Sequence, residues 1–369
     1  MFTVSGGRTM LRISEERALG LCQAALRGLG VAPEKARLCA DSIVFASVRG
    51  LDSHGLVGIL PRMTRELASG KIDPEAEIKV VQESPTTVAL DGANALGPVI
   101  AAEVMNRACD KAESLGLGAA VAFNCNHFGA TSYYSMLAAR RNLIGIMMCN
   151  SNPTVAPYGG RERLFGTNPI SYAVPVEGSA PIVLDIATST VAAMQISKAI
   201  RRGDKVIPLG WVIDSEGKPT TDPHAFANGG ALLPMAGHKG YGLGLLVEML
   251  TGCLSGSVIA QEVPPYSPGP EPLGQSFFGL AVDPGAFGPR ERFASRLRDL
   301  SRYVHGVAPA EGFAEVLLPG EPEERQAARR RVEGIPLLEA EWSAIVTALK
   351  EAGLDVKALQ AKYGPETVA

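Results

Sequence analysis

The chain has 369 residues, of which 46% are hydrophobic and 20% are charged, so it can bury a large core and is not expected to be intrinsically disordered. Its 35 Lys and Arg residues nearly balance its 38 Asp and Glu residues. This balance argues against a nucleic-acid-binding or membrane-surface protein, because either needs a concentrated basic field.

The cysteines and the apolar runs bear on the compartment. The six cysteines form no Cys-x-x-Cys pair, which is typical of a protein kept in a reducing environment. No apolar run reaches the roughly 18–20 residues that span a bilayer, and residues 1–12 lack the apolar stretch of a signal peptide. We therefore expect a cytoplasmic protein with a ragged leader at 1–12.

The N-terminal part is expected to be helical. Ser14 is a suitable N-cap for a helix that ends at Gly30, and Pro33 can begin a second helix. That helix runs into the segment RGLDSHG at 49–55, and a third helix ending near Ala68 follows it.

The middle of the chain alternates short β-rich runs with turns, interrupted by a few helical patterns. Because the strands do not alternate one-for-one with helices, we expect mostly antiparallel pairing and not a doubly wound parallel sheet. The expected strands are 86–92, 117–123, 143–149, 168–175, 180–186, 210–214 and 277–283, and the expected helices are 99–115, 131–141 and 240–254.

The C-terminal part returns to helices, so the fold class predicted is α/β (α+β). Helices are expected at 290–304, 321–333 and 339–352, and an exposed loop at 262–274. We predict a discontinuous helical domain made of 1–80 plus 286–369, with a β-rich domain, 81–285, inserted in it.

Several common motifs are absent. Gly240, Gly242 and Gly244 precede a helix, but Leu245 and Val247 stand where the dinucleotide fingerprint G-x-G-x-x-G needs its third glycine. Neither a Walker phosphate loop nor the G-x-S-x-G of serine hydrolases occurs. The five histidines form no H-x-x-x-H pair, so no metal site is expected.

The segment RGLDSHG carries acid–base and anion-binding chemistry. Arg49 can bind a carboxylate through two parallel hydrogen bonds, and His54 can exchange a proton near neutral pH. Asp52 or Ser53 can hold the tautomer of that histidine. An exposed histidine at a polar helix end is an equally good interpretation of these residues alone.

Three further segments can face a phosphate-bearing ligand. His127 and Gly129 follow an expected strand and precede a helix, where backbone N–H groups bind anions, although an ordinary turn explains them too. Asp185, Thr188 and Ser189 resemble a helix N-terminus that can bind ribose and phosphate, or that is simply capped.

The third segment is AGHKGYG. His238 and Lys239 stand among glycines that allow a ligand to approach the backbone closely. A Schiff-base lysine holding pyridoxal phosphate is an alternative interpretation of this pair.

Seven segments, taken together, are characteristic of one family. The chain resembles the malate/L-lactate dehydrogenase-type family from about residue 12 to 353. That family also holds sulfolactate and ureidoglycolate dehydrogenases, diketogulonate reductase and cyclic-imine carboxylate reductases, and it is distinct from the Rossmann-type lactate and malate dehydrogenases. The segments are, in chain order, RGLDSHG, NHFG, LFGTNPI, PIVLDIATS, LLPMAGHKGYGL, LPGE and VEGIPL.

The resemblance implies a fold and an activity. It implies a largely antiparallel, non-Rossmann sheet that binds NAD or NADP, and a homodimer with active sites near the subunit interface. It implies hydride transfer between the nicotinamide and a small 2-oxo or 2-hydroxy carboxylic acid. The sequence does not choose between NAD and NADP.

The resemblance also assigns roles to residues. His54, with Ser53 beside it, matches the acid/base histidine, and Arg49 matches a residue that binds the substrate carboxylate; His127 is an alternative base. Thr167 and Asn168 match the substrate end. The matching cofactor contacts are His127, Phe128, Gly129, Asp185, Ile186, Ala187, Thr188, Ser189, His238, Lys239, Pro319, Gly320 and Glu321.

Two departures from the family pattern concern the substrate. Many members carry Arg four residues after the histidine, where this chain has Gly58, and its next arginine is Arg62. This loss argues against malate and sulfolactate. Members often carry Gly-Lys or Gly-Asp where this chain has Met194 and Gln195, and Gln195 can bind substrate by hydrogen bonds but cannot relay a proton.

Two alternatives within the family stay open. One is a reductase of a cyclic imine or imino acid, which the loss of the relay acid at Gln195 weakens. The other is a catalytically inactive binding protein, which the retention of Arg49, His54, Asp185 and Lys239 argues against.

Overall fold

The computed structural model of the chain describes residues 10–266 and 269–367, so the leader expected at 1–9 and part of the loop expected at 262–274 lie outside the described residues. The described chain forms two compact units. The first contains residues 10–75, 269–270 and 320–367, and the second contains 76–266 and 271–319. The domain boundaries at 80/81 and 285/286 stay a prediction.

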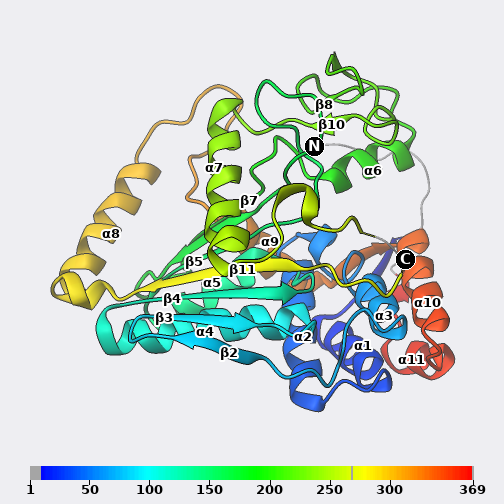
Figure 1. Cartoon of the computed structure of the whole chain (residues 1–369), viewed down its shortest axis with the longest axis horizontal. Helices are drawn as coiled ribbons and strands as arrows, with labels where there is room; N and C mark the ends of the chain where they lie inside the picture. Colours follow the sequence, from blue (N-terminus) through cyan, green and yellow to red (C-terminus); the bar gives the residue numbers. More distant parts are fainter. Residues whose placement is uncertain (1–9, 267–268, 368–369) are drawn as a thin grey trace. The chain divides into compact units, whose positions relative to one another are not determined.

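The first unit is mainly helical and is built from both ends of the chain (Figure 1). Its elements are β1 (Met10–Ile13), α1 (Glu15–Gly28), α2 (Pro33–Val48), the 3₁₀ turn η1 (Asp52–His54), α3 (Leu60–Ala68), α9 (Glu321–Glu333), β12 (Ile335–Leu338), α10 (Glu339–Glu351), α11 (Val356–Tyr363) and β13 (Glu366–Thr367).

Local signals set the starts of the first helices, as expected. The Ser14 side chain accepts a hydrogen bond from the Arg17 amide at the start of α1, and Pro33 occupies the first turn of α2. An irregular leader was expected at residues 1–12, and this is wrong for the part that the structure describes. Residues 10–13 form β1, which pairs antiparallel with β12 and β13. The strands that pair with β1 lie more than 300 residues away in the sequence, so no local sequence pattern predicts β1.

The second unit is built on a seven-stranded sheet. Its elements are β2 (Lys79–Glu83), β3 (Thr87–Asp91), α4 (Gly97–Leu115), β4 (Leu117–Cys125), α5 (Thr131–Arg140), β5 (Ile144–Cys149), β6 (Ile170–Val174), β7 (Ile182–Ile186), α6 (Ala193–Arg202), β8 (Val212–Ile213), β9 (Pro219–Thr220), β10 (Ala231–Leu232), α7 (His238–Glu248), the π turn η2 (Met249–Cys253), the 3₁₀ turns η3 (Ala260–Glu262) and η4 (Pro284–Phe287), β11 (Gln275–Val282) and α8 (Arg290–His305).

The sheet is largely antiparallel, and this confirms the predicted fold class. Its strand order is β2-β3-β4-β11-β5-β6-β7, and within the described residues only β3 and β4 pair parallel. A doubly wound parallel sheet is therefore absent from the described chain, in agreement with the missing dinucleotide fingerprint.

The central strand β11 has a helix on each face. Neighbouring residues of a strand point to opposite sides, so adjacent positions of β11 contact different helices. A side chain at Gly279 would contact Val104 of α4, so this face packs against α4. Phe278 instead shares an apolar cluster with Val247 of α7 and Met148 of β5. In the view of Figure 1, α7 is drawn above β11 and α4 below it.

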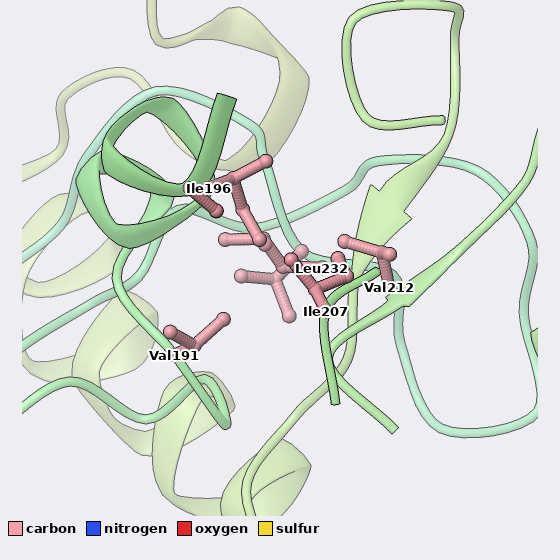
Figure 2. Close-up of a cluster of buried hydrophobic side chains, with 7 residues drawn as sticks. Val191, Ile196, Ile207, Val212 and Leu232 are labelled. Atoms are coloured by element: carbon pink, nitrogen blue, oxygen red, sulfur yellow. The ribbon is translucent and has the colours of Figure 1, made fainter. Parts of the chain in front are cut away.

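A smaller lobe has an apolar core of its own. The short sheet β10-β8-β9 and helix α6 enclose this core (Figure 2). Helix α6 was not predicted from the sequence. The buried side chains of the lobe are Val155, Val191, Ile196, Ala199, Ile207, Val212 and Leu232.

Neither a membrane-spanning helix nor a metal site is expected from the sequence. Within residues 10–266 and 269–367, no helix combines the length and apolarity that crossing a membrane requires. Across the same ranges no group of three or more His, Cys, Asp or Glu side chains is arranged to hold a metal ion.

Truncating Ile207 tests the packing of the small lobe. We expect Ile207→Ala to lower the free energy of unfolding by about 2–5 kcal/mol, because it leaves a cavity in the buried cluster. Val206→Ala is the matched control, since that neighbouring side chain is 69% exposed and its truncation should change stability by less than about 0.5 kcal/mol. Chemical denaturation measures both, and equal losses would contradict the packing described.

Candidate active site

The turn that carries His54 is packed tightly against the end of α2. The Leu56 amide donates a 2.7 Å hydrogen bond to Ser47 Oγ, and a side chain at Gly55 would lie 2.3 Å from that same oxygen. Gly50 has a φ of +83°, which favours glycine where α2 ends. Residues 50–55 are therefore held in one conformation by the end of the helix.

His54 is half-buried and bonded to the preceding residue. Its Nδ1 lies 2.8 Å from Ser53 Oγ. The pKa of His54 is lowered from 6.5 to about 4. Burial is the larger cause, and the positive charge of Arg62 is the second. The imidazole is therefore neutral at neutral pH.

The hydroxyl partner suits both protonation states of His54. Ser53 Oγ accepts from Nδ1–H whether the ring is neutral or cationic, so a proton can be gained and lost at Nε2 while this bond is kept. A histidine bonded in this way can act as both acid and base.

Arg49 does not fit its predicted role as the substrate anchor. Its side chain is 5% exposed, and Nη1 lies 2.6 Å from Glu324 Oε2 of α9. Nη2 donates to the Gly320 carbonyl at 3.3 Å, and the guanidinium lies over the Phe45 ring. Both terminal nitrogens are thus used within the protein, and the geometry gives Arg49 a structural role.

Asp52 is also used for packing. Arg330 of α9 donates from Nη1 to Asp52 Oδ1 at 2.5 Å, and the same nitrogen donates to the Ser47 carbonyl. Of the two residues that could hold the tautomer of His54, Ser53 is therefore the one in place. Two ion pairs, Arg330–Asp52 and Arg49–Glu324, join the turn to α9.

In the second unit, His127 is held in one tautomer. The Gly129 amide donates to His127 Nδ1 at 3.1 Å, so Nδ1 carries a lone pair and the neutral ring carries its proton on Nε2. Protonating Nδ1 would break that bond. His127 can therefore donate a hydrogen bond from Nε2, but it cannot accept a proton there.

Phe128 and Gly129 serve mainly to shape this loop. Phe128 is buried, with edge-to-face contacts to Tyr134 and Phe277, and its carbonyl accepts a hydrogen bond from Tyr134 Oη. Gly129 has a φ of +89°. The Phe128 side chain is therefore part of the core, which is at odds with a direct cofactor contact.

The helix N-terminus expected at 185–189 is wrong. Asp185 lies in β7, and α6 begins only at Ala193. Asp185 Oδ2 accepts a 2.8 Å hydrogen bond from the Ser132 amide in the first turn of α5. A carboxylate thus already caps the helix that follows His127, so a pyrophosphate there would meet a like charge.

The hydroxyls after β7 are likewise used within the protein. Thr188 and Ser189 are buried and donate to the carbonyls of Thr167 and Val191. This arrangement fits the structural interpretation of these two residues and is at odds with hydroxyls that donate to a phosphate. Ile186 and Ala187, which precede Thr188, are half-buried.

Asn168 does not fit a direct substrate contact. It is fully buried with a φ of +33°, and its Nδ2 donates to the Gly244 carbonyl and to Glu248 Oε1. Its Oδ1 accepts from the Ser151 amide. Thr167, the preceding residue, is half-buried, and its carbonyl oxygen accepts a hydrogen bond from the Thr188 hydroxyl.

Glu248 is a buried carboxylate that was not predicted from the sequence. Burial raises its pKa, although Asn168 Nδ2 at 2.9 Å and the Ala260 amide at 3.2 Å both donate to it. It ends α7 just before the π turn η2. A lone glutamate in a helix usually faces solvent, so the sequence carries no signal for this burial.

The remaining predicted contacts lie at element ends. His238 and Lys239 are exposed in the first turn of α7, where the Tyr158 ring meets the His238 ring edge-on. Gln195 is exposed on α6. Pro319 is exposed, and its carbonyl accepts from the Val183 amide of β7.

Gly320 and Glu321 belong to the first unit. Gly320 precedes α9 with a φ of +94°. Glu321 opens that helix, where an acidic residue complements the helix dipole.

Five buried side-chain oxygens of the second unit lack a hydrogen-bond partner within the described residues, and two of them lie just before α5 and in its first turn. Asn126 Oδ1 and Ser132 Oγ have no hydrogen-bond partner within the part of the chain that the structure describes. The Asn126 amide cannot simply be reversed, because its Nδ2 donates to the carbonyls of Asn94 and Ala95. Oxygens of this kind fit a ligand that donates hydrogen bonds, as the amide and hydroxyl groups of a dinucleotide do.

Comparison with known proteins relates these features to one family. Residues 13–346 match the family described as malate/L-lactate dehydrogenase. The chain is 38% identical to L-sulfolactate dehydrogenase of Methanocaldococcus jannaschii over 333 residues, or 90% of this chain and 94% of that protein. It is 34% identical to ureidoglycolate dehydrogenase (NAD(+)) of Escherichia coli K12, over 89% of this chain and 93% of that one.

Solved structures agree with this relationship. The structure of the M. jannaschii sulfolactate dehydrogenase matches with a TM-score of 0.86 at 36% identity, covering 94% of this chain and 99% of that one. Delta1-piperideine-2-carboxylate reductase of Pseudomonas syringae pvar. tomato matches with a TM-score of 0.82 at 32% identity, covering 91% and 99%.

Proposed function

The chain belongs to the malate/L-lactate dehydrogenase family and is an oxidoreductase, and we propose that it interconverts a small 2-oxo acid and the matching 2-hydroxy acid with His54 as acid and base. It uses a nicotinamide cofactor, NAD or NADP, as its family does. The observation that carries the assignment of His54 is its bond to the Ser53 hydroxyl, which is compatible with both protonation states.

The protein's own residues handle the proton, while the bound nicotinamide supplies or takes the hydride. In the oxidative direction, neutral His54 accepts the hydroxyl proton at Nε2 while Nδ1–H donates to Ser53 Oγ. In the reductive direction, the same nitrogen returns the proton to the oxygen that develops negative charge. His127, which carries its proton on Nε2, acts as a neutral hydrogen-bond donor to a ligand oxygen.

Reduction of a cyclic imine is the second candidate, because one solved relative is a piperideine-carboxylate reductase. The two reactions differ in product, an alcohol or an amine. NADH and NADPH binding, read by nicotinamide fluorescence, followed by turnover of 2-oxo acids and cyclic imino acids, separates them. Binding of neither dinucleotide would contradict both.

We also place the protein in the cytoplasm and propose that it works as a homodimer. All six cysteines are free thiols, and five of them are buried, which suits a reducing compartment. Leu243, Leu246 and Met249 of α7 and η2 are exposed apolar side chains close together in sequence. A second copy of the chain would cover such a surface, as the family resemblance implies.

A charge on this surface tests the dimer. We expect Leu246→Arg to convert the protein to a monomer in sedimentation analysis, because an unpaired charge would be buried at the interface. Leu209→Arg is the control, since Leu209 is an exposed apolar residue on a different segment. A dimer that persists in Leu246→Arg would place the interface elsewhere.

Replacing each histidine tests the assignment of the base. We expect His54→Ala to lower the turnover number by about 10²–10⁴-fold with little change in dinucleotide affinity, because it removes the acid/base. His127→Asn keeps a hydrogen-bond donor and should cost much less. A larger loss in His127→Asn than in His54→Ala would exchange the two roles.

The pH profile follows from the pKa of His54. Since that pKa is about 4, the base form is already present at neutral pH. We expect kcat/KM for oxidation to be flat above about pH 5, whereas kcat/KM for reduction, which needs the protonated ring, falls about tenfold per pH unit above the pKa. An oxidation profile still rising between pH 6 and 7 would point to another base.

A further inference from the structure

Helix α7 packs against the rest of its unit through a face of small residues. Gly240, Gly244 and Glu248 recur at intervals of four residues, so they share this face. A side chain at Gly240 would lie 2.7 Å from the Thr188 carbonyl oxygen, and one at Gly244 would lie 3.1 Å from Thr188 Oγ1. The two glycines therefore allow close packing, but they offer no projecting side chain that would fix the helix lengthwise.

Hydrogen bonds from Asn168 supply a fixed point on this face. Asn168 Nδ2 donates to the Gly244 carbonyl at 3.1 Å and to Glu248 Oε1 at 2.9 Å. Asn168 is itself held, because its Oδ1 accepts from the Ser151 amide at 3.1 Å. Moving α7 by one residue would turn its face by about 100° and break both bonds from Nδ2.

The other oxygen of Glu248 joins α7 to the segment that follows the π turn η2. The Ala260 amide donates to Glu248 Oε2 at 3.2 Å, and Ala260 has a φ of +49°, which is uncommon for alanine. Both carboxylate oxygens thus accept from donors that lie on other segments. A protonated carboxyl would carry a hydrogen on one of these oxygens, so the arrangement suits the ionised form.

Burial of this carboxylate lowers the stability of the fold at neutral pH. Burial raises the pKa of Glu248, so the folded chain binds the proton more tightly than the unfolded chain does. Stability is therefore lost as the pH rises from the unfolded pKa through the folded one. A buried polar group that lowers stability has its best-attested use in fixing the register between packed helices.

We propose that Glu248 is a positioning residue, which with Asn168 sets the register of α7 and so places the Lys239 ammonium for the dinucleotide. This inference rests on the proposed function. Lys239 is exposed in the first turn of α7, at the positive end of the helix dipole, where phosphates are attracted. Because Lys239 and Glu248 belong to one continuous helix, a constraint at one end fixes the other.

Glu248→Gln tests the register at nearly constant side-chain volume. The new amide nitrogen would face either Asn168 Nδ2 or the Ala260 amide, so one hydrogen bond is lost. We expect the dissociation constant for NADH or NADPH, read by nicotinamide fluorescence, to rise about 5–30-fold. The turnover number at saturating dinucleotide should stay within about twofold of the wild type. The midpoint of thermal unfolding should not fall, because a buried charge is removed.

Two neighbouring variants control for local packing. Thr251→Val removes the 2.6 Å hydrogen bond that Thr251 Oγ1 donates to the Val247 carbonyl, one turn from Glu248. Glu262→Gln changes an exposed carboxylate that accepts from the Ile259 amide. Both should bind the dinucleotide as the wild type does. Unchanged affinity in Glu248→Gln, or an equal loss in either control, would overturn the proposal.

Combining the change with Lys239→Met tests whether Glu248 acts through Lys239. We expect Lys239→Met to weaken dinucleotide binding, and we expect the double variant to bind as Lys239→Met alone does, because no placed cation is left to move. Additive losses, or normal binding by Lys239→Met, would overturn this route.

Hydrogen exchange of the free enzyme separates failure of the register role from failure of the proposed function. We expect backbone amides of residues 238–247 to exchange faster in Glu248→Gln than in the wild type and in Thr251→Val. Equal exchange in all three proteins would overturn the register role, whatever cofactor binds. Faster exchange in Glu248→Gln, with neither dinucleotide bound by the wild type, would support the register role and contradict the proposed function.

Discussion

Two ion pairs, Arg49 with Glu324 and Arg330 with Asp52, hold the turn on which the proposed chemistry depends. The paired residues are 275 and 278 positions apart in the chain. Both arginines are buried and their carboxylate partners are partly exposed, so losing either carboxylate would leave a buried guanidinium without its compensating charge. They fix the end of α2 against α9. The short 3₁₀ turn η1 that follows brings the Ser53 hydroxyl within hydrogen-bond distance of His54 Nδ1.

The two candidate histidines are distinguished by the kind of group that each one meets. A hydroxyl can accept as well as donate, whereas a backbone amide only donates. Ser53 therefore leaves His54 able to change its protonation state, and Gly129 fixes His127 as a neutral donor. The sequence shows both histidines in polar, glycine-containing segments, and only the hydrogen-bond partners tell them apart.

The sequence was a good guide wherever structure depends on neighbours in the chain. Ser14 and Pro33 begin helices as predicted, and the alternating runs became an antiparallel sheet. It was a poor guide where distant segments decide, as for β1, for Asp185 capping α5 and for Arg49 pairing with α9. The family resemblance named these polar residues as ligand contacts, but their partners lie too far away in sequence to be read from it.

The division of the first unit between the two ends of the chain also has a consequence for biosynthesis. The second unit is drawn from residues 76–319, so all of it has been synthesised before α9 is made. Glu324 and Arg330 belong to α9 itself, and the strand partners of β1 follow it in the chain. A nascent chain that ends before residue 320 therefore contains the whole sequence of the sheet unit, whereas α2 still lacks α9, the helix with which it forms ion pairs.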